Sequence, residues 1–117
     1  QAWVLAHQAQ LAAIDSDQAR LRADSPSNGG NPSVWLGDWA RFHDDVLAAS
    51  ALPDPGGAAS PYWHQMLGYY IKGSSELVGA LRAGDAAGQA QAVRDLTAGD
   101  QAARQFDQAM GLSSPSG

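Results

Sequence analysis

The sequence predicts an all-α protein, a four-helix antiparallel up-and-down bundle. Four segments of about 20 to 25 residues place apolar side chains three or four positions apart, which is the spacing of an amphipathic helix. Short stretches rich in proline and glycine separate these segments, as expected for a bundle with short loops. The clearest helical face lies in residues 33–47, where Trp35, Trp39, Phe42 and Val46 point the same way.

The first predicted helix runs from about Ala2 to Ala23. Its apolar face consists of Trp3, His7, Leu11, Ile14, Gln18 and Leu21. Arg20 and Arg22 fall in its last turn, where positive charge interacts favourably with the helix dipole. Residues 25–32 contain two prolines and a pair of glycines, so the helix must end before them.

The second predicted helix runs from about Ser33 to Ala51. Asn31 or Ser33 can cap its N-terminus, and Pro32 fits in the first turn, where proline is tolerated. The segment 52–57, which reads Leu-Pro-Asp-Pro-Gly-Gly, ends this helix.

The third predicted helix begins at Ser60, an N-cap residue that Pro61 follows, and extends to about Ala83. Its inner face is formed by Trp63, Leu67, Tyr70, Ser74, Leu77 and Leu81. Gly84 and Asp85 then form a two-residue link, because glycine terminates helices and aspartate caps them. Such a short link makes the third and fourth helices antiparallel neighbours.

The fourth predicted helix continues to about Met110. The Ala-Gly-Asp sequence that precedes this helix recurs at 98–100, so a break at Gly99 is one alternative. The apolar spacing continues through Gly99, which favours a single helix with a kink or weak point there. Residues 1–111 are therefore predicted to form one helical domain, and residues 112–117 a disordered tail rich in serine, proline and glycine.

Composition and charge limit the partners. The chain has 117 residues, enough for a single core, and a formal net charge of −5, with Lys72 as its one lysine. This balance argues against nucleic acid as a partner, because phosphate contacts need clustered lysine and arginine. No apolar run approaches the ~20 residues of a transmembrane helix. Cysteine is absent, which excludes disulfides and thiolate metal sites.

The sequence begins Gln1-Ala2-Trp3 without a methionine, and its expected surface positions use Asp, Gln and Ala in place of Glu and Lys. These features favour an extracytoplasmic protein, secreted or membrane-anchored, from which an N-terminal signal or lipid-anchor segment has been removed. A cytoplasmic location is the alternative.

Two places in the predicted bundle could bind a ligand. Folding the chain about its loops places Phe42 of the second helix opposite Tyr70 of the third. His43 then also lies near Tyr70 at mid-height, with Asp100 on the flank.

His7 and His64 fall at one end of the bundle, with Asp107 or Arg104 nearby and with Trp3 and Trp63 as apolar walls. His7 and His43 differ in level by about 10 Å at the helical rise per residue, so these two side chains are not expected to share one ion.

A third candidate is a partly exposed aromatic patch. Tyr62 and Tyr69 fall at the margin of the third helix, and Lys72 lies close to Tyr69. Such a patch could bind a protein partner or a small ligand.

Three aspartates fall on the side of the second helix that lies opposite its aromatic residues: Asp38, Asp44 and Asp45. They are expected to face solvent. Asp44 and Asp45 are therefore not expected to join the neighbouring His43 in a metal site.

No phosphate loop or cofactor motif accompanies these residues. Ser74 lies on an apolar face with no histidine expected at its level, and no Glu-x-x-His or His-x-x-x-His pair points to a metal. We therefore expect a non-enzymatic helical bundle without a cofactor that binds a protein partner or a small ligand. The alternative is a metal- or haem-binding bundle that uses His7 and His64, or His43 and Tyr70.

Overall fold

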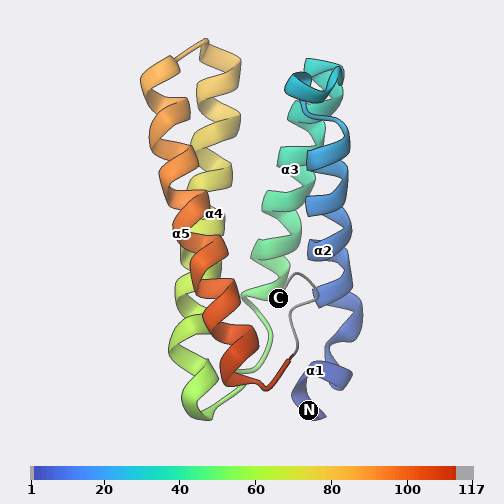
Figure 1. Cartoon of the computed structure of the whole chain (residues 1–117), viewed down its shortest axis with the longest axis vertical. Helices are drawn as coiled ribbons and strands as arrows, with labels where there is room; N and C mark the ends of the chain where they lie inside the picture. Colours follow the sequence, from blue (N-terminus) through green and yellow to red (C-terminus); the bar gives the residue numbers. More distant parts are fainter. Residues whose placement is uncertain (1, 113–117) are drawn as a thin grey trace.

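The structure is a computed structural model that describes residues 2–112, and every regular element in that range is helical (Figure 1). The helices are α1 (Ala2–Ala6), α2 (Gln8–Ala23), η1 (Pro26–Asn28), α3 (Pro32–Ala49), η2 (Gly57–Ala59), α4 (Ser60–Ala83) and α5 (Ala86–Ala109), where η denotes a 3-10 helix. The predicted all-α class is therefore confirmed. None of these helices is long and apolar enough to cross a membrane.

The four long helices lie side by side, and successive helices run in opposite directions (Figure 1). α2 packs on α3, α3 on α4, and α4 on α5. α2 and α5 hardly touch each other. The helices therefore form two hairpins, α2–α3 and α4–α5, which meet along one side and stay apart along the other.

The core is built where the hairpins meet. Phe42 and Val46 of α3, Trp63 and Tyr70 of α4, and Phe106 of α5 are all buried. The rings of Phe42 and Tyr70 meet edge to face with centroids 5.2 Å apart, which confirms that these two residues lie opposite each other. The rings of Trp63 and Phe106 are also 5.2 Å apart, so aromatic contacts connect α3, α4 and α5.

The first predicted helix is interrupted at His7, so the expectation of one unbroken helix over residues 2–23 is wrong. The backbone N–H of His7 is shared between Trp3 O and Val4 O at 3.2 and 3.3 Å, and its φ of −118° lies outside the helical range. The break redirects α1 so that the Trp3 indole packs edge-on against Trp63, with centroids 4.9 Å apart. The apolar contact of Trp3 offsets the weakened helical hydrogen bonds.

The N-terminal caps of α3 and α5 and the C-terminal end of α4 agree with the prediction. Asn31 Oδ1 accepts a backbone N–H of the first turn of α3 at 2.8 Å, and Pro32 occupies that turn. Gly84 ends α4 with a φ of 67°, a left-handed conformation that glycine adopts without steric cost. Asp85 caps α5 by accepting the N–H of Gly88 at 3.0 Å.

The start of α4 differs from the prediction. The sequence predicts Ser60 as the N-cap, yet Ala59 holds that position and has no side chain that could cap the helix. Ser60 Oγ instead donates to Asp54 Oδ2 at 2.9 Å. The hydroxyl therefore ties the α3–α4 loop to the first turn of α4 instead of capping it.

The last helix continues through Gly99 without a break, as its apolar spacing predicts. Beyond this helix, the structure differs from the prediction that Leu112 belongs to a disordered tail. Leu112 packs against the core and donates its backbone N–H to Asp107 O at 2.8 Å. The rest of that predicted tail, residues 113–117, lies outside the described residues.

Carboxyl groups are paired across two helix interfaces. Asp17 of α2 faces Asp45 of α3, and Glu76 of α4 faces Asp95 of α5. One oxygen of Asp17 and one of Glu76 are buried and accept no hydrogen bond from an N–H or hydroxyl group. The contact with Asp95 and burial raise the pKa of Glu76. Burial and the contact with Asp45 likewise raise the pKa of Asp17 to about 7.

Two aspartates of α3 are less exposed than predicted. Asp38 is buried and Asp45 is half-buried, whereas Asp44 is exposed as expected. α4 covers the aromatic face of α3 and α2 covers another flank, so the buried arc of α3 is wider than its apolar stripe. Burial and the contact with Asp24 raise the pKa of Asp38.

Candidate ligand-binding cleft

The side on which α2 and α5 stay apart contains a cleft with two cavities. The first, here called the α1 cavity, lies between α1, the first half of α2 and the second half of α5, and its volume is about 350 Å³. The second, the turn cavity, lies toward the α2–α3 turn and has a volume of about 890 Å³. Asp15, Gln18, Tyr70 and Ala103 line both cavities, so the two adjoin at these residues.

The walls of the α1 cavity are mainly apolar. They include Val4, Leu11, Ala12, Ile14, Trp63, Met66, Phe106 and Leu112. Polar groups enter from both sides, namely Asp15 and Gln18 from α2 and Asp107 from α5. Apolar walls with a few polar groups are typical of a site for a small ligand.

The turn cavity is larger and more polar. Trp35, Trp39 and Phe42 line one wall as a row of rings, with successive centroids 6.0 and 5.7 Å apart. Arg22 and Arg104 add positive charge to the lining. The two cavities therefore offer different chemistry within one cleft.

Tyr70 is the polar centre of the cleft. Its hydroxyl donates to Asp100 Oδ1 at 2.5 Å and accepts a hydrogen bond from Gln18 Nε2 at 3.2 Å. These bonds connect α2, α4 and α5 across the cleft. Burial and the contact with Asp100 raise the pKa of Tyr70, so the hydroxyl stays protonated and acts as a donor.

Gly99 allows the Tyr70 ring to reach this position. A Cβ atom at Gly99 would lie 2.5 Å from the ring, closer than packed atoms approach. We expect Gly99→Ala to lower the free energy of unfolding by about 1–3 kcal/mol, because the ring must move away from Asp100.

Gly79→Ala is the matched control for Gly99→Ala. A Cβ atom at Gly79 in α4 meets no atom within 4 Å, so this change should stabilise the helix by about 0.5–1 kcal/mol. Thermal unfolding compares the two variants. If both gain stability, the Tyr70 ring is not held against Gly99.

His43 lies beside Ser74, which is about one helical turn along α4 from Tyr70, the partner predicted for His43. Its Nδ1 atom is 2.9 Å from Ser74 Oγ. Ser74 is fully buried and donates its hydroxyl proton to Tyr70 O at 2.6 Å, so Nδ1 of His43 is the donor to Oγ. The expectation that no histidine lies at the level of Ser74 is therefore wrong. A ligand-binding role for the half-buried His43 stays a prediction.

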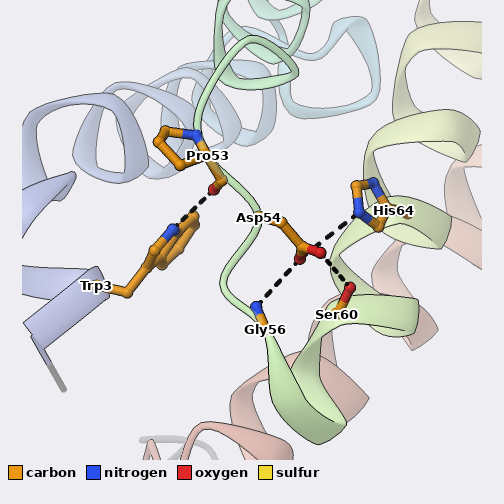
Figure 2. A network of polar contacts seen from close by, with 6 residues as sticks. All are labelled: Trp3, Pro53, Asp54, Gly56, Ser60 and His64. Atoms are coloured by element: carbon orange, nitrogen blue, oxygen red, sulfur yellow. Dashed lines mark hydrogen bonds and ion pairs between the residues drawn. The ribbon is translucent and has the colours of Figure 1, made fainter.

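The other two histidines have separate neighbours at the α1 end of the molecule. The His7 ring packs edge-on against Trp3, with centroids 4.9 Å apart. His64 Nε2 lies 3.7 Å from Asp54 Oδ1, and 62% of its side chain is exposed (Figure 2). Within residues 2–112, no group of three or more His, Asp or Glu side chains is placed to hold a metal ion.

Asp54 organises the α3–α4 loop at the same end. Its carboxylate accepts the Ser60 hydroxyl at 2.9 Å and the Gly56 N–H at 3.1 Å, and these bonds lower the pKa of Asp54. Trp3 Nε1 donates to Pro53 O at 2.8 Å on the other side of the loop (Figure 2). These contacts hold α1, the loop and α4 together next to the α1 cavity.

Tyr62 and Tyr69 lie at the margin of the buried face of α4. Tyr62 is half-buried and packs against the core, whereas 40% of Tyr69 is exposed. The other large apolar residues that are exposed in the described range belong to α1, α3 and α5: Leu5, Val34, Leu47 and Val93. Ligand or partner binding at the two tyrosines stays a prediction.

Comparison with protein-family models, curated proteins and solved structures finds no match for this chain. No relative therefore supplies a function. The cleft is the feature of the fold from which a function can be inferred.

The sequence-based prediction assigns no ligand-binding role to several cleft residues, among them Asp15, Gln18 and Ala103. Gln18 carries a signal, because it is a polar side chain within the apolar face of the first predicted helix. Ala103 falls on the apolar face of the fourth predicted helix, which predicts that it points inward but not that it lines a cavity. Asp15 carries no signal, since its position in a cavity depends on the distance between α2 and α5.

Proposed function

We propose that this protein binds a small ligand in the cleft between α2 and α5, without an enzymatic activity. In this proposal the four long helices form a four-helix antiparallel up-and-down bundle that is open along the α2–α5 side. The alternating helix directions and the neighbour order α2–α3–α4–α5 support that arrangement. The extracytoplasmic location inferred from the composition remains part of the proposal.

The observation that carries the proposal is the α1 cavity. Its volume of about 350 Å³ lies within the usual range of small-ligand sites, about 300–1,000 Å³. Trp63, Met66 and Phe106 are core residues that also form its walls, so packed helices hold the cavity in shape. An apolar ligand that displaces water from such walls gains about 25 cal/mol for each Å² that it covers.

Two buried hydroxyl groups, those of Ser74 and Tyr70, favour binding over catalysis. A nucleophile needs a neighbouring base that accepts its proton. The Ser74 proton is donated to a backbone carbonyl, and the nitrogen of His43 that faces Ser74 carries a proton of its own. The Tyr70 hydroxyl does have a neighbouring acceptor in Asp100, but burial and that carboxylate raise the pKa of Tyr70, so the hydroxyl keeps its proton and is a poor nucleophile.

Octanol is a suitable first probe, because it is uncharged and has one apolar chain. Ala103 lies in the α5 wall, so Ala103→Trp should fill the α1 cavity and weaken octanol binding about tenfold or more. Ala12→Trp enters the same cavity from α2 at an exposed position, where a larger side chain is accommodated. Ala90→Trp is the control, because Ala90 is exposed on α5 and lines neither cavity.

Calorimetry measures the binding, after circular dichroism has established that each variant is folded. The proposal predicts that both cavity variants lose affinity for octanol and that the control keeps it. Equal affinity in all three variants would place octanol outside the cleft. Absence of binding to the unmodified protein would leave the cavity without a function. Either result overturns the proposal.

A further inference from the structure

Two carboxyl groups face the α1 cavity from opposite helices. Asp15 of α2 and Asp107 of α5 both line it. Asp15 is exposed and Asp107 is half-buried, and partial desolvation raises the pKa of each. The negative charge of Asp15 adds to the rise at Asp107. Arg22 opposes the rise at Asp15 in part. Both carboxylates thus place negative charge on the lining of one cavity.

The α1 cavity has no cationic side chain that would neutralise these charges. Among the described residues, its lining contains no lysine, arginine or histidine. Arg22 and Arg104 line the turn cavity instead. A cation bound in the α1 cavity would relieve the repulsion between the carboxylates, whereas an anion would increase it.

The remaining walls fit the apolar part of a cationic ligand. Trp63, Tyr70 and Phe106 contribute aromatic rings to the cavity, and the faces of such rings attract both apolar groups and cations. Gln18 adds an amide group at the rim, close to the Tyr70 hydroxyl. The cavity thus combines an apolar interior with negative charge at its sides.

We propose that the ligand of the α1 cavity is an amine with an apolar body, whose ammonium group is held between the carboxylates of Asp15 and Asp107. This inference rests on the proposed binding function and adds the charge of the ligand to it. The apolar body occupies the space between Trp63, Met66 and Phe106.

The test compares three probes that share one alkyl chain, namely octylamine, octanol and octanoate. Calorimetry measures the binding of each to the full chain near neutral pH, where the amine is a cation and the acid is an anion. Octylamine should bind at least about tenfold more tightly than octanol, because hydrogen bonds to charged groups are the stronger ones. Octanoate should bind more weakly than octanol.

Asp15→Asn and Asp107→Asn remove the charges and nearly preserve the shapes of the side chains. Each should lower the affinity for octylamine, measured relative to the affinity for octanol, about fivefold or more. Asp44→Asn is the control, because Asp44 is exposed on α3 and lines neither cavity. It changes the net charge by the same amount, so a general charge effect would appear in it as well.

The pH dependence of binding gives a separate readout. The carboxyl groups of Asp15 and Asp107 become neutral as the pH falls through their raised pKa values. Octylamine should then lose its advantage over octanol. Octanol binding should stay nearly constant over the same range.

The outcomes separate this inference from the proposed function. Equal affinity for octylamine and octanol, with both lost in Ala103→Trp, would overturn the charge assignment and support the binding function. Tighter binding of octanoate would also overturn the charge assignment, by placing the ligand near the arginines of the turn cavity. Failure of all three probes to bind would overturn both proposals.

Discussion

Trp63→Ala should lower the free energy of unfolding by about 3–5 kcal/mol, the range found for large aromatic truncations in cores. Only 1% of Trp63 is exposed, and its ring lies 4.9 Å from that of Trp3 and 5.2 Å from that of Phe106, measured between centroids. The indole therefore connects α1, α4 and α5. Because small domains have a total stability of about 5–15 kcal/mol, this single change removes a large share of it.

Tyr69→Ala is the matched control on the same helix. Because 40% of Tyr69 is exposed, its loss should cost no more than about 1 kcal/mol. Chemical denaturation measures both variants against the unmodified protein. If the two variants have the same denaturation midpoint, then α1 does not pack against the core through Trp63.

Mild acidification should stabilise the protein. Burial, followed by the hydrogen bond with Asp45, raises the pKa of Asp17 from 3.8 to about 7. Folding therefore favours the protonated form of Asp17. The stabilisation from this group is complete below the pKa of Asp17 in the unfolded chain, and it is lost as the pH rises through the pKa of Asp17 in the folded protein. Arg20, 2.8 Å from Asp17, limits the cost of ionisation. We expect the free energy of unfolding to be roughly 2–3 kcal/mol greater near pH 5 than near pH 8.

Asp17→Asn isolates the contribution of this group. Asparagine resembles the protonated carboxyl group in size and can donate a hydrogen bond to Asp45. The variant should be more stable than the unmodified protein near pH 8, with a flatter dependence on pH. Asp44→Asn, at an exposed position, should leave the dependence unchanged. If thermal unfolding instead shows stability that rises from pH 5 to pH 8, Asp17 is ionised in the folded state.

The ends of most helices could be predicted from the sequence because they depend on local chemistry. Asn31 and Asp85 cap helices within their own first turns, and Gly84 ends a helix through its own backbone. The break at His7 could not be predicted in this way. Folding the chain about its loops correctly brings Trp3 and Trp63 to the same end of the bundle. Residue spacing does not show that the first helix breaks where the two rings meet.

The register between helices was predicted in part. Folding the chain about its loops correctly places Phe42 opposite Tyr70, but it misses the hydrogen bond of His43 to Ser74. Loops of about eight residues leave an uncertainty of about one helical turn, which is enough to exchange one polar partner for another.

The cleft depends on helix spacing, which a one-dimensional pattern does not encode. α4 and α5 approach closely because Gly73 and Gly99 leave room for Leu96 and Tyr70. No comparably close approach forms between α2 and α5. An apolar face on each helix predicts burial, but whether that burial leaves a cavity depends on how the two hairpins meet.

A titration of the ¹⁵N-labelled full chain with octylamine, followed by NMR, tests the ligand-binding cleft most directly. We predict that the largest changes in amide chemical shift occur at Asp15, Gln18, Ala103 and Asp107, which line the α1 cavity from both sides. The amide of Asp44, on the outer side of α3, should not move. Changes that centre on Asp44 and its neighbours, with the four cleft amides unmoved, would contradict a binding site between α2 and α5.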